Sequence, residues 1–528
     1  MVIQEERTIR NEDGKDAISR IHSVLSNSLI ICLLGIFPLV YHNNYIDIQT
    51  CKAWAFRVIA VCYLLAEAGI LVFSYRCKKK NHCDRPGKVS YYDSFLILFV
   101  AGITLSSVFS KWPIYSLNGN MGRNVGTVDL FLVSCLYLAL IRHFRIRKFV
   151  LYIVSALNGL EFLLIILNFW GLDPLKMYEN LIKKQHNVFI GTVGNINVAC
   201  GFLCIVLPAD MALFVICRNK YRKAVYGLLI LFGTYAGFAT SCDSFLLGCA
   251  AAFGSLVLYV ICTESGMMEL SVCLFLFFLA ALAMRLSLRF AHYYKVHSRF
   301  IRYYEKDSFL ASFINSPFLA VVLGCAIILS VLSILSKSRF QVRVLKILFC
   351  FAIAMLCAGI LLVLISNLFS GMRQTQRFSW LNQLVIDDEF GSGRGYIWKR
   401  SLEMWMSYPF SEKMIGCGTD CFFLQMVPVY GQEMMDLFEE VFADAHCEFL
   451  QLLVTTGLIG VVGYFGFWSG ILIAVWRKMK EIPALLICLA SICAYMVQGF
   501  LNNLVPACVP LIFVFAAIAK NISLSSES

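Results

Sequence analysis

The sequence predicts an all-α integral membrane protein that crosses the bilayer about fourteen times and carries one large extracytoplasmic loop. Of its 528 residues, 59% are hydrophobic and only 15% are charged, and the mean hydropathy is +0.74. An ordinary soluble domain carries about 25% charged residues. Apolar runs of about 20 residues, long enough to cross a bilayer core of about 30 Å, recur along the whole chain. No water-soluble fold would bury so much apolar surface.

The expected helices follow one another along nearly the whole chain. About eleven fall within residues 1–368 and about three within residues 446–528, with the polar segment 369–445 between them. Residues 1–24 lack the order of regions of a signal peptide, so we expect the first apolar run to remain as an anchor. The expected helices are 24–41, 54–75, 91–109, 125–141, 149–169, 195–217, 224–240, 243–262, 268–288, 316–335, 344–368, 446–475, 483–500 and 504–520.

Basic residues indicate the orientation of the chain. Short cytoplasmic loops of membrane proteins carry an excess of Lys and Arg. Dense basic clusters occupy the short connections at 76–80, 142–148 and 218–223. We therefore expect both termini in the cytoplasm. The expected outer loops are 110–124, 170–194, 289–315 and 369–445.

The charge pattern argues against a nucleic-acid-binding protein, and the placement of the cysteines argues against a disulfide-stabilised scaffold. The net charge of +12 comes from short clusters between apolar runs, without the basic stripe and interleaved aromatics of a nucleic-acid-binding surface. Most of the 22 cysteines lie inside apolar runs, where cysteine behaves as a small hydrophobe. Cys417 and Cys421 lie close together in a polar loop, where they form a bridge, half of a metal site or two ordinary thiols. We predict no nucleic-acid partner.

The loop 369–445 contains an amphipathic stretch. A glycine run at 391–395 includes Arg394 and leads into residues that place four apolar side chains on one helical face: Trp398, Leu402, Trp405 and Met406. This pattern is typical of a helix lying flat in the membrane interface. It would hold Arg394 at headgroup level, where a guanidinium either grips a lipid pyrophosphate or contacts ordinary phospholipid headgroups. Arg400, on the polar face, is a further candidate for binding the substrate.

A histidine stands where this loop meets the next helix. His446 precedes the apolar run that continues to 475. Neutral imidazole at such a site can act as a general base that takes a proton from an acceptor hydroxyl. The alternative is an interfacial histidine whose partners are backbone or headgroup atoms.

These residues together resemble the hallmark of the O-antigen ligase and polymerase family. That hallmark is His, then Asn, Ser or Gln, nine residues, and Gly-x-x-Gly; here His446 is followed by Cys447, nine residues, and Gly457-x-x-Gly460. The second position departs from the pattern. Further resembling segments are Gly393-Arg394 with Trp398, Pro409, Gly416-Cys417-Gly418 and Phe422; Ser106 to Ser110, then Gly119, Gly122, Arg123 and Gly126; Gly171-Leu172-Asp173-Pro174; and Gly191-Thr192-Val193-Gly194-Asn195-Ile196-Asn197.

A second departure concerns an arginine. Many members of that family carry a Ser-Arg pair at the outer end of a helix, whereas this chain has Ser241-Cys242-Asp243-Ser244. Four arginines in the expected outer loops are candidates to replace it, and the sequence does not choose among Arg123, Arg289, Arg299 and Arg302. Asn195 and Asn197 either bind the substrate or simply cap a helix.

The resemblance implies a fold like that of GT-C glycosyltransferases and an inverting, metal-independent enzyme. Such an enzyme transfers a glycan from polyprenyl pyrophosphate to an acceptor hydroxyl on a glycan, lipid or cell-wall component, at the outer face of a bacterial cytoplasmic membrane. His446 would activate the acceptor and Arg394 would stabilise the leaving pyrophosphate. The chain lacks an Asp-x-Asp metal signature, and we expect no cofactor. A ligase and a polymerase share this donor chemistry, so the sequence does not distinguish between them. It also does not identify the sugars of the glycan or the acceptor.

A flippase or transporter for lipid-linked glycans is the alternative from another class. Many transporters have two related halves and charged residues deep in the bundle. This sequence shows no internal repeat, few ionisable residues within its helices and long outer loops. The enzyme interpretation further predicts that Arg394, Arg123 and His446 meet at one outer cavity.

Overall fold

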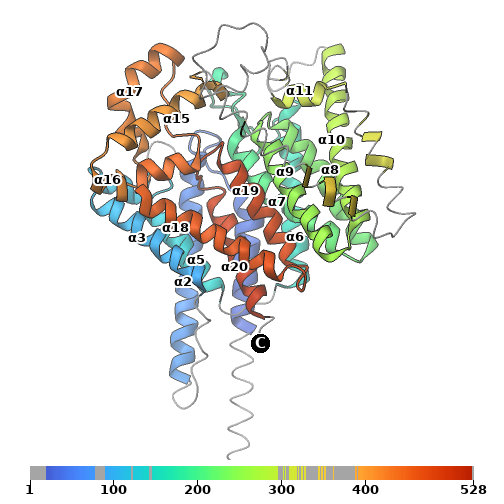
Figure 1. The fold of residues 1–528 in the computed structure, drawn as a ribbon, viewed down its shortest axis with the longest axis horizontal. Helices are drawn as coiled ribbons and strands as arrows, with labels where there is room; N and C mark the ends of the chain where they lie inside the picture. Colours follow the sequence, from blue (N-terminus) through green and yellow to red (C-terminus); the bar gives the residue numbers. More distant parts are fainter. Residues whose placement is uncertain are drawn as a thin grey trace, which may run out of the picture.

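A computed structural model describes residues 20–77, 90–119, 123–141, 146–294 and 390–525, together with scattered residues between 301 and 388. The described part is built almost entirely of helices, arranged as a bundle with α15 and α17 above it (Figure 1). Within the described residues, a single two-stranded hairpin interrupts the helices, in which β1 (Phe189–Ile190) pairs antiparallel with β2 (Gly194–Asn195). The predicted all-α class is confirmed.

The helix bounds agree closely with the sequence pattern. A first span covers Arg20–Leu39 and ends in a π-helical turn and a 3₁₀ turn. The helices after it are α2 (Ile48–Cys77), α3 (Tyr91–Val108), α4 (Pro113–Asn118), α5 (Thr127–Leu140), α6 (Lys148–Phe169), α7 (Ile196–Ile216), α8 (Lys220–Ala239), α9 (Ser244–Thr263), α10 (Met267–Tyr293), α11 (Phe309–Asn315), α15 (Phe390–Ser407), α16 (Phe410–Ile415), α17 (Phe422–Phe438), α18 (Glu448–Lys478), α19 (Leu485–Gly499) and α20 (Val509–Ser525).

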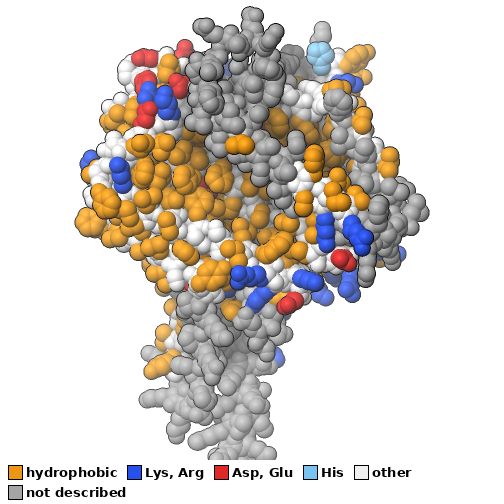
Figure 2. Space-filling model, viewed as in Figure 1, with side chains coloured by type: hydrophobic (Ala, Val, Ile, Leu, Met, Phe, Trp, Pro, Cys, Tyr) orange, Lys and Arg blue, Asp and Glu red, His pale blue; other side chains and the backbone are white. Residues whose placement is uncertain are grey.

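Within the described residues, 8 helices are long and apolar enough to cross a membrane. Three shorter apolar helices are Thr127–Leu140, Leu485–Gly499 and Val509–Leu524. The helices predicted at 316–335 and 344–368 fall largely outside the described residues. Hydrophobic side chains cover the middle of the face in Figure 2, and Lys and Arg side chains gather below them. The chain is therefore a multi-pass membrane protein.

Helix α7 forms the centre of the bundle. It contacts α8, α9 and α19, and almost all of its side chains from Val198 to Val215 are buried. Because its neighbours cover it on all sides, α7 is apolar around nearly its whole circumference. Its few polar side chains include Asn197 near the first end of the helix and Asp210 nearer the other end.

Helices α18 and α3 approach each other closely through glycines. A Cβ atom on Gly102 would lie 3.0 Å from the Gly460 nitrogen, and one on Gly463 would lie 2.4 Å from the Phe99 nitrogen. Small residues let two membrane helices bring their backbones together, where dispersion contacts accumulate. The second glycine of the Gly457-x-x-Gly460 motif thus contributes to helix packing.

The first glycine of that motif bends α18. Gly457 has φ +64° and ψ −168° inside the helix, a conformation that favours glycine. The end of α16 lies directly against the bend, because a Cβ on Gly457 would be 2.4 Å from the carbonyl carbon of Met414. Any larger side chain at position 457 would therefore clash with the backbone of Met414.

The bend frees carbonyl groups that neighbouring segments then use. The Cys417 nitrogen donates to the Val454 carbonyl at 3.1 Å, and the Gly418 nitrogen donates to the Thr455 carbonyl at 3.0 Å. The Ser106 hydroxyl also donates to the Thr455 carbonyl, at 2.5 Å. Non-helical backbone inside a membrane protein needs such partners. The bent segment therefore ties the loop after α16 and the end of α3 to the start of α18.

The predicted outer loop 369–445 contains helices of its own. The described part, from Phe390 onward, forms α15, α16 and α17, and the predicted amphipathic helix at 391–406 is α15. Its buried side includes Tyr396, Ile397 and Met404, which pack in a cluster with residues of α17. Two members of the predicted apolar face are exposed, Leu402 at 44% and Met406 at 61%. The helix is therefore apolar on two sides, one packed on the protein and one outward.

Candidate functional site

Four of the residues singled out from the sequence meet at one small cavity. Arg123, Asn195, Asn197 and His446 all line it. They come from the segment before α5, from the start of α7 and from the segment before α18. The other lining residues belong to α7, α19 and the segment that leads into α20: Val198, Gly201, Tyr495, Gln498, Asn502, Asn503, Val505 and Cys508.

His446 is held in a defined orientation by Asp444. The Asp444 Oδ1 atom lies 3.2 Å from the His446 Nδ1 atom and accepts a hydrogen bond of 2.9 Å from the His446 backbone nitrogen. Asn503 donates its side-chain amide to the same carboxylate oxygen. Because a carboxylate partner keeps the proton on Nδ1, the Nε2 atom is left with its lone pair. The backbone of His446 has φ +47°, so the turn that presents the ring is itself unusual.

Asp444 also forms an ion pair with Arg123. The carboxylate is buried, with 1% of its side chain exposed, whereas 21% of the Arg123 side chain is exposed. A buried carboxylate needs such a partner, because an unpaired charge away from water is costly. A guanidinium has five N–H donors, so Arg123 can bind Asp444 and still offer donors to another group. Arg123 lines a second small cavity as well, together with Asp444, Thr419 and Asp420.

The electrostatics favour a neutral histidine. Burial lowers the pKa of His446; the negative charge of Asp444 raises it, and the positive charges of Arg123 and Arg394 lower it again, so the net pKa is below the usual value. Burial alone would raise the pKa of the Asp444 carboxyl, but Arg123, followed by His446, brings it below its usual value. At neutral pH the pair therefore consists of an ionised aspartate and a histidine able to accept a proton.

The segment that carries Arg123 is fixed by polar contacts on both sides. Arg57 in α2 forms an ion pair with Asp129 at 2.7 Å and donates to the Asn118 carbonyl at 2.6 Å. The Asn124 side chain donates to the Thr50 hydroxyl at 3.1 Å. These bonds anchor the chain before and after Arg123, which explains why a short irregular segment can hold a guanidinium at a fixed place.

Arg394 lies on α15 near His446 but, unlike Arg123 and His446, it does not line the cavity, so the predicted meeting of the three residues at one cavity is not seen. A Cβ on Gly393 would lie 2.5 Å from the ring of Phe442, and that ring meets the His446 ring edge-on with centroids 6.1 Å apart. Gly393 has φ +88°, so only glycine fits comfortably beside Phe442. The Arg394 Nη1 atom donates to the Gly391 carbonyl at 3.0 Å, while its buried Nε atom has no hydrogen-bond partner within the described residues. Arg394 thus lies close enough to affect His446 and keeps a donor available.

The two asparagines have structural partners within the cavity wall. The Asn195 side chain caps α7 by accepting from the Val198 nitrogen at 2.9 Å. The Asn197 side-chain oxygen accepts from the Cys242 thiol at 3.2 Å. Both hydrogen bonds use the amide oxygen, which leaves the NH₂ groups as possible donors toward a ligand.

The position of the family's Ser-Arg pair lies beside Arg394. Cys242 belongs to the turn between α8 and α9, and the positive charge of Arg394 acts to lower the pKa of its thiol, although its contact with Cys200 and then burial raise it overall. The positive charge of Arg394 therefore acts on the turn that lacks the expected arginine.

The other predicted arginines lie elsewhere. Arg400 forms ion pairs with Glu403 and Glu433 and lies over the rings of Tyr396 and Tyr430 at 5.3 and 5.2 Å. It joins α15 to α17 and does not line the cavity. Arg289 is exposed near the end of α10 and does not line it either. Arg299 and Arg302 lie outside the described residues.

Sequence reasoning missed Asp444 and Asn503. Asp444 stands two residues before His446, which is a usable signal, since a carboxylate near a candidate base often orients it. Asn503 lies in an irregular segment between two apolar helices, and nothing in its local pattern points to His446. Asn503 comes to the site because α18, α19 and α20 are neighbours in the bundle.

Metal ligands do not gather among the described residues. No group of three or more His, Cys, Asp or Glu side chains in that part of the chain is placed to hold a metal ion. Cys417 and Cys421 are buried free thiols.

Comparison with known proteins supports the resemblance seen in the sequence. Residues 307–465 match the model of the O-antigen ligase family. The matched stretch contains Arg394, Asp444, His446 and both glycines of the motif. No curated protein matches the chain. The match confirms the resemblance to the O-antigen ligase family over this stretch of the chain, in keeping with polysaccharide biosynthesis.

Proposed function

We propose that this protein is a membrane glycosyltransferase that transfers a glycan from polyprenyl pyrophosphate to an acceptor hydroxyl, as a ligase or as a polymerase. The observation that carries the proposal is the cavity where Asp444 orients His446 beside Arg123. The match of residues 307–465 to the O-antigen ligase family supports the same reaction class.

The reaction follows from the arrangement of the charges. The acceptor hydroxyl donates its proton to His446 Nε2 while its oxygen attacks the anomeric carbon of the donor sugar. The bond from that carbon to the pyrophosphate oxygen breaks, and the electron pair leaves with the pyrophosphate. Attack from the side opposite to the leaving group inverts the anomeric configuration. The lowered pKa of His446 keeps the base neutral, and Asp444 stabilises the imidazolium that forms.

Arginines bind the leaving group in this proposal. Arg394 has a buried donor without a partner among the residues that the structure describes, and Arg123 has donors beyond those that Asp444 can use. Guanidinium groups match the paired oxygens of a pyrophosphate, and they supply positive charge without a divalent ion. Asn195 and Asn197 are positioned to contact the donor from the start of α7. Arg400 and Arg289 remain candidates for contacts with a longer glycan away from the cavity, and Arg302, which lies outside the described residues, remains a candidate from the sequence alone.

The cavity is proposed to face the outside of a bacterial cytoplasmic membrane, with both termini inside. Lipid-linked donors are used there after they have crossed the bilayer, and the basic clusters favour the cytoplasm for the opposite loops. Helix α15 presents Leu402 and Met406 outward, as expected for a helix in the interface that meets lipid-borne substrates.

The proposal is tested by product analysis. Purified protein in liposomes receives a defined polyprenyl-pyrophosphate oligosaccharide and candidate acceptors, and mass spectrometry and NMR identify the new bond and its configuration. We expect a glycosidic bond with inverted configuration and release of polyprenyl pyrophosphate. Movement of intact donor across the bilayer without a new bond would instead identify a flippase.

A further inference from the structure

A second, larger cavity lies at the other end of the bundle. Its volume is about 510 Å³, within the range of about 300–1,000 Å³ of small-molecule sites. Helices α7 and α19 line both cavities with opposite ends: Val198 of α7 faces the His446 cavity and Asp210 faces this one. Twelve residues of helix separate these two positions, or about 18 Å. The second cavity is therefore distinct from the site already described.

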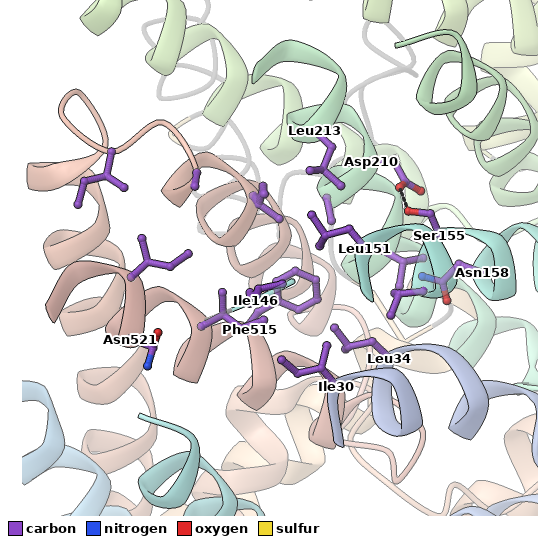
Figure 3. A pocket seen from close by; sticks show the side chains of 18 residues that line it. Ile30, Leu34, Ile146, Leu151, Ser155, Asn158, Asp210, Leu213, Phe515 and Asn521 are labelled. Atoms are coloured by element: carbon purple, nitrogen blue, oxygen red, sulfur yellow. Dashed lines mark hydrogen bonds between the residues drawn. The ribbon is translucent and has the colours of Figure 1, made fainter. Parts of the chain in front are cut away.

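One wall of this cavity is polar, and the rest is apolar except for Asn521 of α20. Ser155 and Asn158 of α6 face Asp210 of α7, and the Ser155 hydroxyl donates to Asp210 Oδ1 at 3.2 Å (Figure 3). Asp210 is 3% exposed and Asn158 is 4% exposed. Yet the Asp210 Oδ2 and Asn158 Oδ1 atoms have no hydrogen-bond partner within the described residues. Such buried polar atoms are costly inside a membrane unless a ligand uses them.

The opposite wall is made of apolar side chains that are partly exposed. They come from the start of α6, the start of α19 and the end of α20: Ile146, Leu151, Val154, Ile482, Ala484, Ile487 and Ile522. The buried side chains Leu34 and Phe515 also line the cavity (Figure 3). An opening edged by Ile, Leu and Val favours entry from lipid over entry from water.

The polar wall restricts the head of the ligand. Its two open atoms are oxygens, so the ligand must donate a hydrogen bond. A phosphate head is disfavoured, because it would bring negative charge to Asp210. A cationic head would lose its hydration on passing the apolar opening. A hydroxyl meets both conditions, because it donates to a carboxylate and can also accept from a protonated carboxyl group.

We propose that this cavity binds an uncharged lipid alcohol, whose hydroxyl reaches Asp210 and Asn158 and whose hydrocarbon chain fills the apolar part toward the membrane. The site is separate from the glycan-transfer cavity and does not depend on the function proposed for that cavity. A bound lipid alcohol would join α6 to α7, α19 and α20.

Photolabelling of the wild-type protein tests the proposal directly. The protein in lipid nanodiscs receives a long-chain primary alcohol with a diazirine in its chain, or the matched methyl ether, primary amine or phosphate monoester. We expect the alcohol to label peptides of α6, α7 and α20. The ether, which cannot donate, should label them about tenfold less, the loss expected for one hydrogen bond to a charged or strongly polar acceptor.

Variants locate the binding site. Ala209, which lines the cavity, is changed to Phe so that its ring fills the space, and we expect labelling by the alcohol to disappear. Ala156→Phe, on an exposed part of α6, is the control and should label like wild type. Asp210→Leu, which leaves only the Asn158 oxygen as an acceptor, should reduce the preference for the alcohol over the ether.

Three results would overturn the proposal. Equal labelling of the wild type by alcohol and ether would mean that the polar wall does not recognise a hydroxyl. Stronger labelling by the amine or the phosphate ester would assign the site to a charged lipid. Undiminished labelling of Ala209→Phe would place the labelled site outside this cavity.

Discussion

Asp444 and Arg123 both act on His446 through their charges. Replacing one or the other should move the pH dependence of glycan transfer in opposite directions. A general base works only when it is deprotonated, so the rate rises with pH through the pKa of His446. The negative charge of Asp444 raises this pKa and the positive charge of Arg123 lowers it. In Asp444→Asn the pKa should fall and the acidic limb should move to lower pH. In Arg123→Gln the pKa should rise and the limb should move to higher pH.

The height of the plateau gives a second readout. Asp444 holds both the Nδ1 atom and the backbone nitrogen of His446, at 3.2 and 2.9 Å. Asp444→Asn should therefore lose the orientation of the general base. Such a loss reduces the rate by about 10²- to 10⁴-fold, which corresponds to about 2.7–5.4 kcal/mol of barrier. Arg123→Gln loses charged hydrogen bonds to the donor as well, so kcat/KM should fall by about 10- to 100-fold.

The assay is the initial rate of transfer by purified protein in liposomes, measured from acidic to alkaline pH at several donor concentrations. Lys176→Gln serves as the control, because Lys176 is an exposed loop residue that pairs with Glu179. The acidic limb of the pH profile of Lys176→Gln should not move. Shifts of the same sign in Asp444→Asn and Arg123→Gln, or an unmoved limb in both, would refute the assignment of His446 as the base.

Other perturbations address the remaining parts of the proposal. Arg394→Lys should lose nearly as much transfer as Arg394→Ala, since lysine cannot form the two parallel hydrogen bonds of a guanidinium group to phosphate oxygens. A wild-type rate in Arg394→Lys would mean that Arg394 contributes only its positive charge. Gly393→Ala should lower the rate by about tenfold or more by displacing Phe442 and straining the backbone, whereas Gly254→Ala, with no atom within 4 Å of its Cβ, should leave the rate unchanged; similar rates in both would contradict the packing argument. Activity should survive EDTA, and loss restored by Mg²⁺ or Mn²⁺ would contradict metal independence. A cysteine placed near Glu433, after removal of the native outer cysteines, should react with an impermeant thiol reagent from outside; protection would reverse the topology.

The sequence predicted the helical architecture well, because membrane helices are specified locally. Apolar runs of fixed length predicted the bounds of most described helices to within a few residues. The helix at 391–406 was predicted from its spacing and is present as α15. The helices α16 and α17 were not predicted, because they are amphipathic or short and are stabilised by packing on α15 and α18.

The site was predictable only in part, since its geometry comes from contacts between distant segments. His446, Arg123, Asn195 and Asn197 were predicted and do line one cavity. The ion pair between Arg123 and Asp444 joins two segments far apart in the chain, and no local pattern reveals it. The role of the Gly457-x-x-Gly460 motif also needed the structure, which assigns Gly457 to a bend and Gly460 to contact with α3.

Single-turnover transfer by His446→Ala, measured together with its affinity for the donor, tests the central claim most directly. A general base acts on the acceptor, so we predict transfer about 10²- to 10⁴-fold slower than wild type while the Kd for the polyprenyl-pyrophosphate oligosaccharide stays the same. Near-normal turnover in this variant would remove His446 from the chemistry, and slow turnover explained wholly by weaker donor binding would make it a binding residue instead of the base.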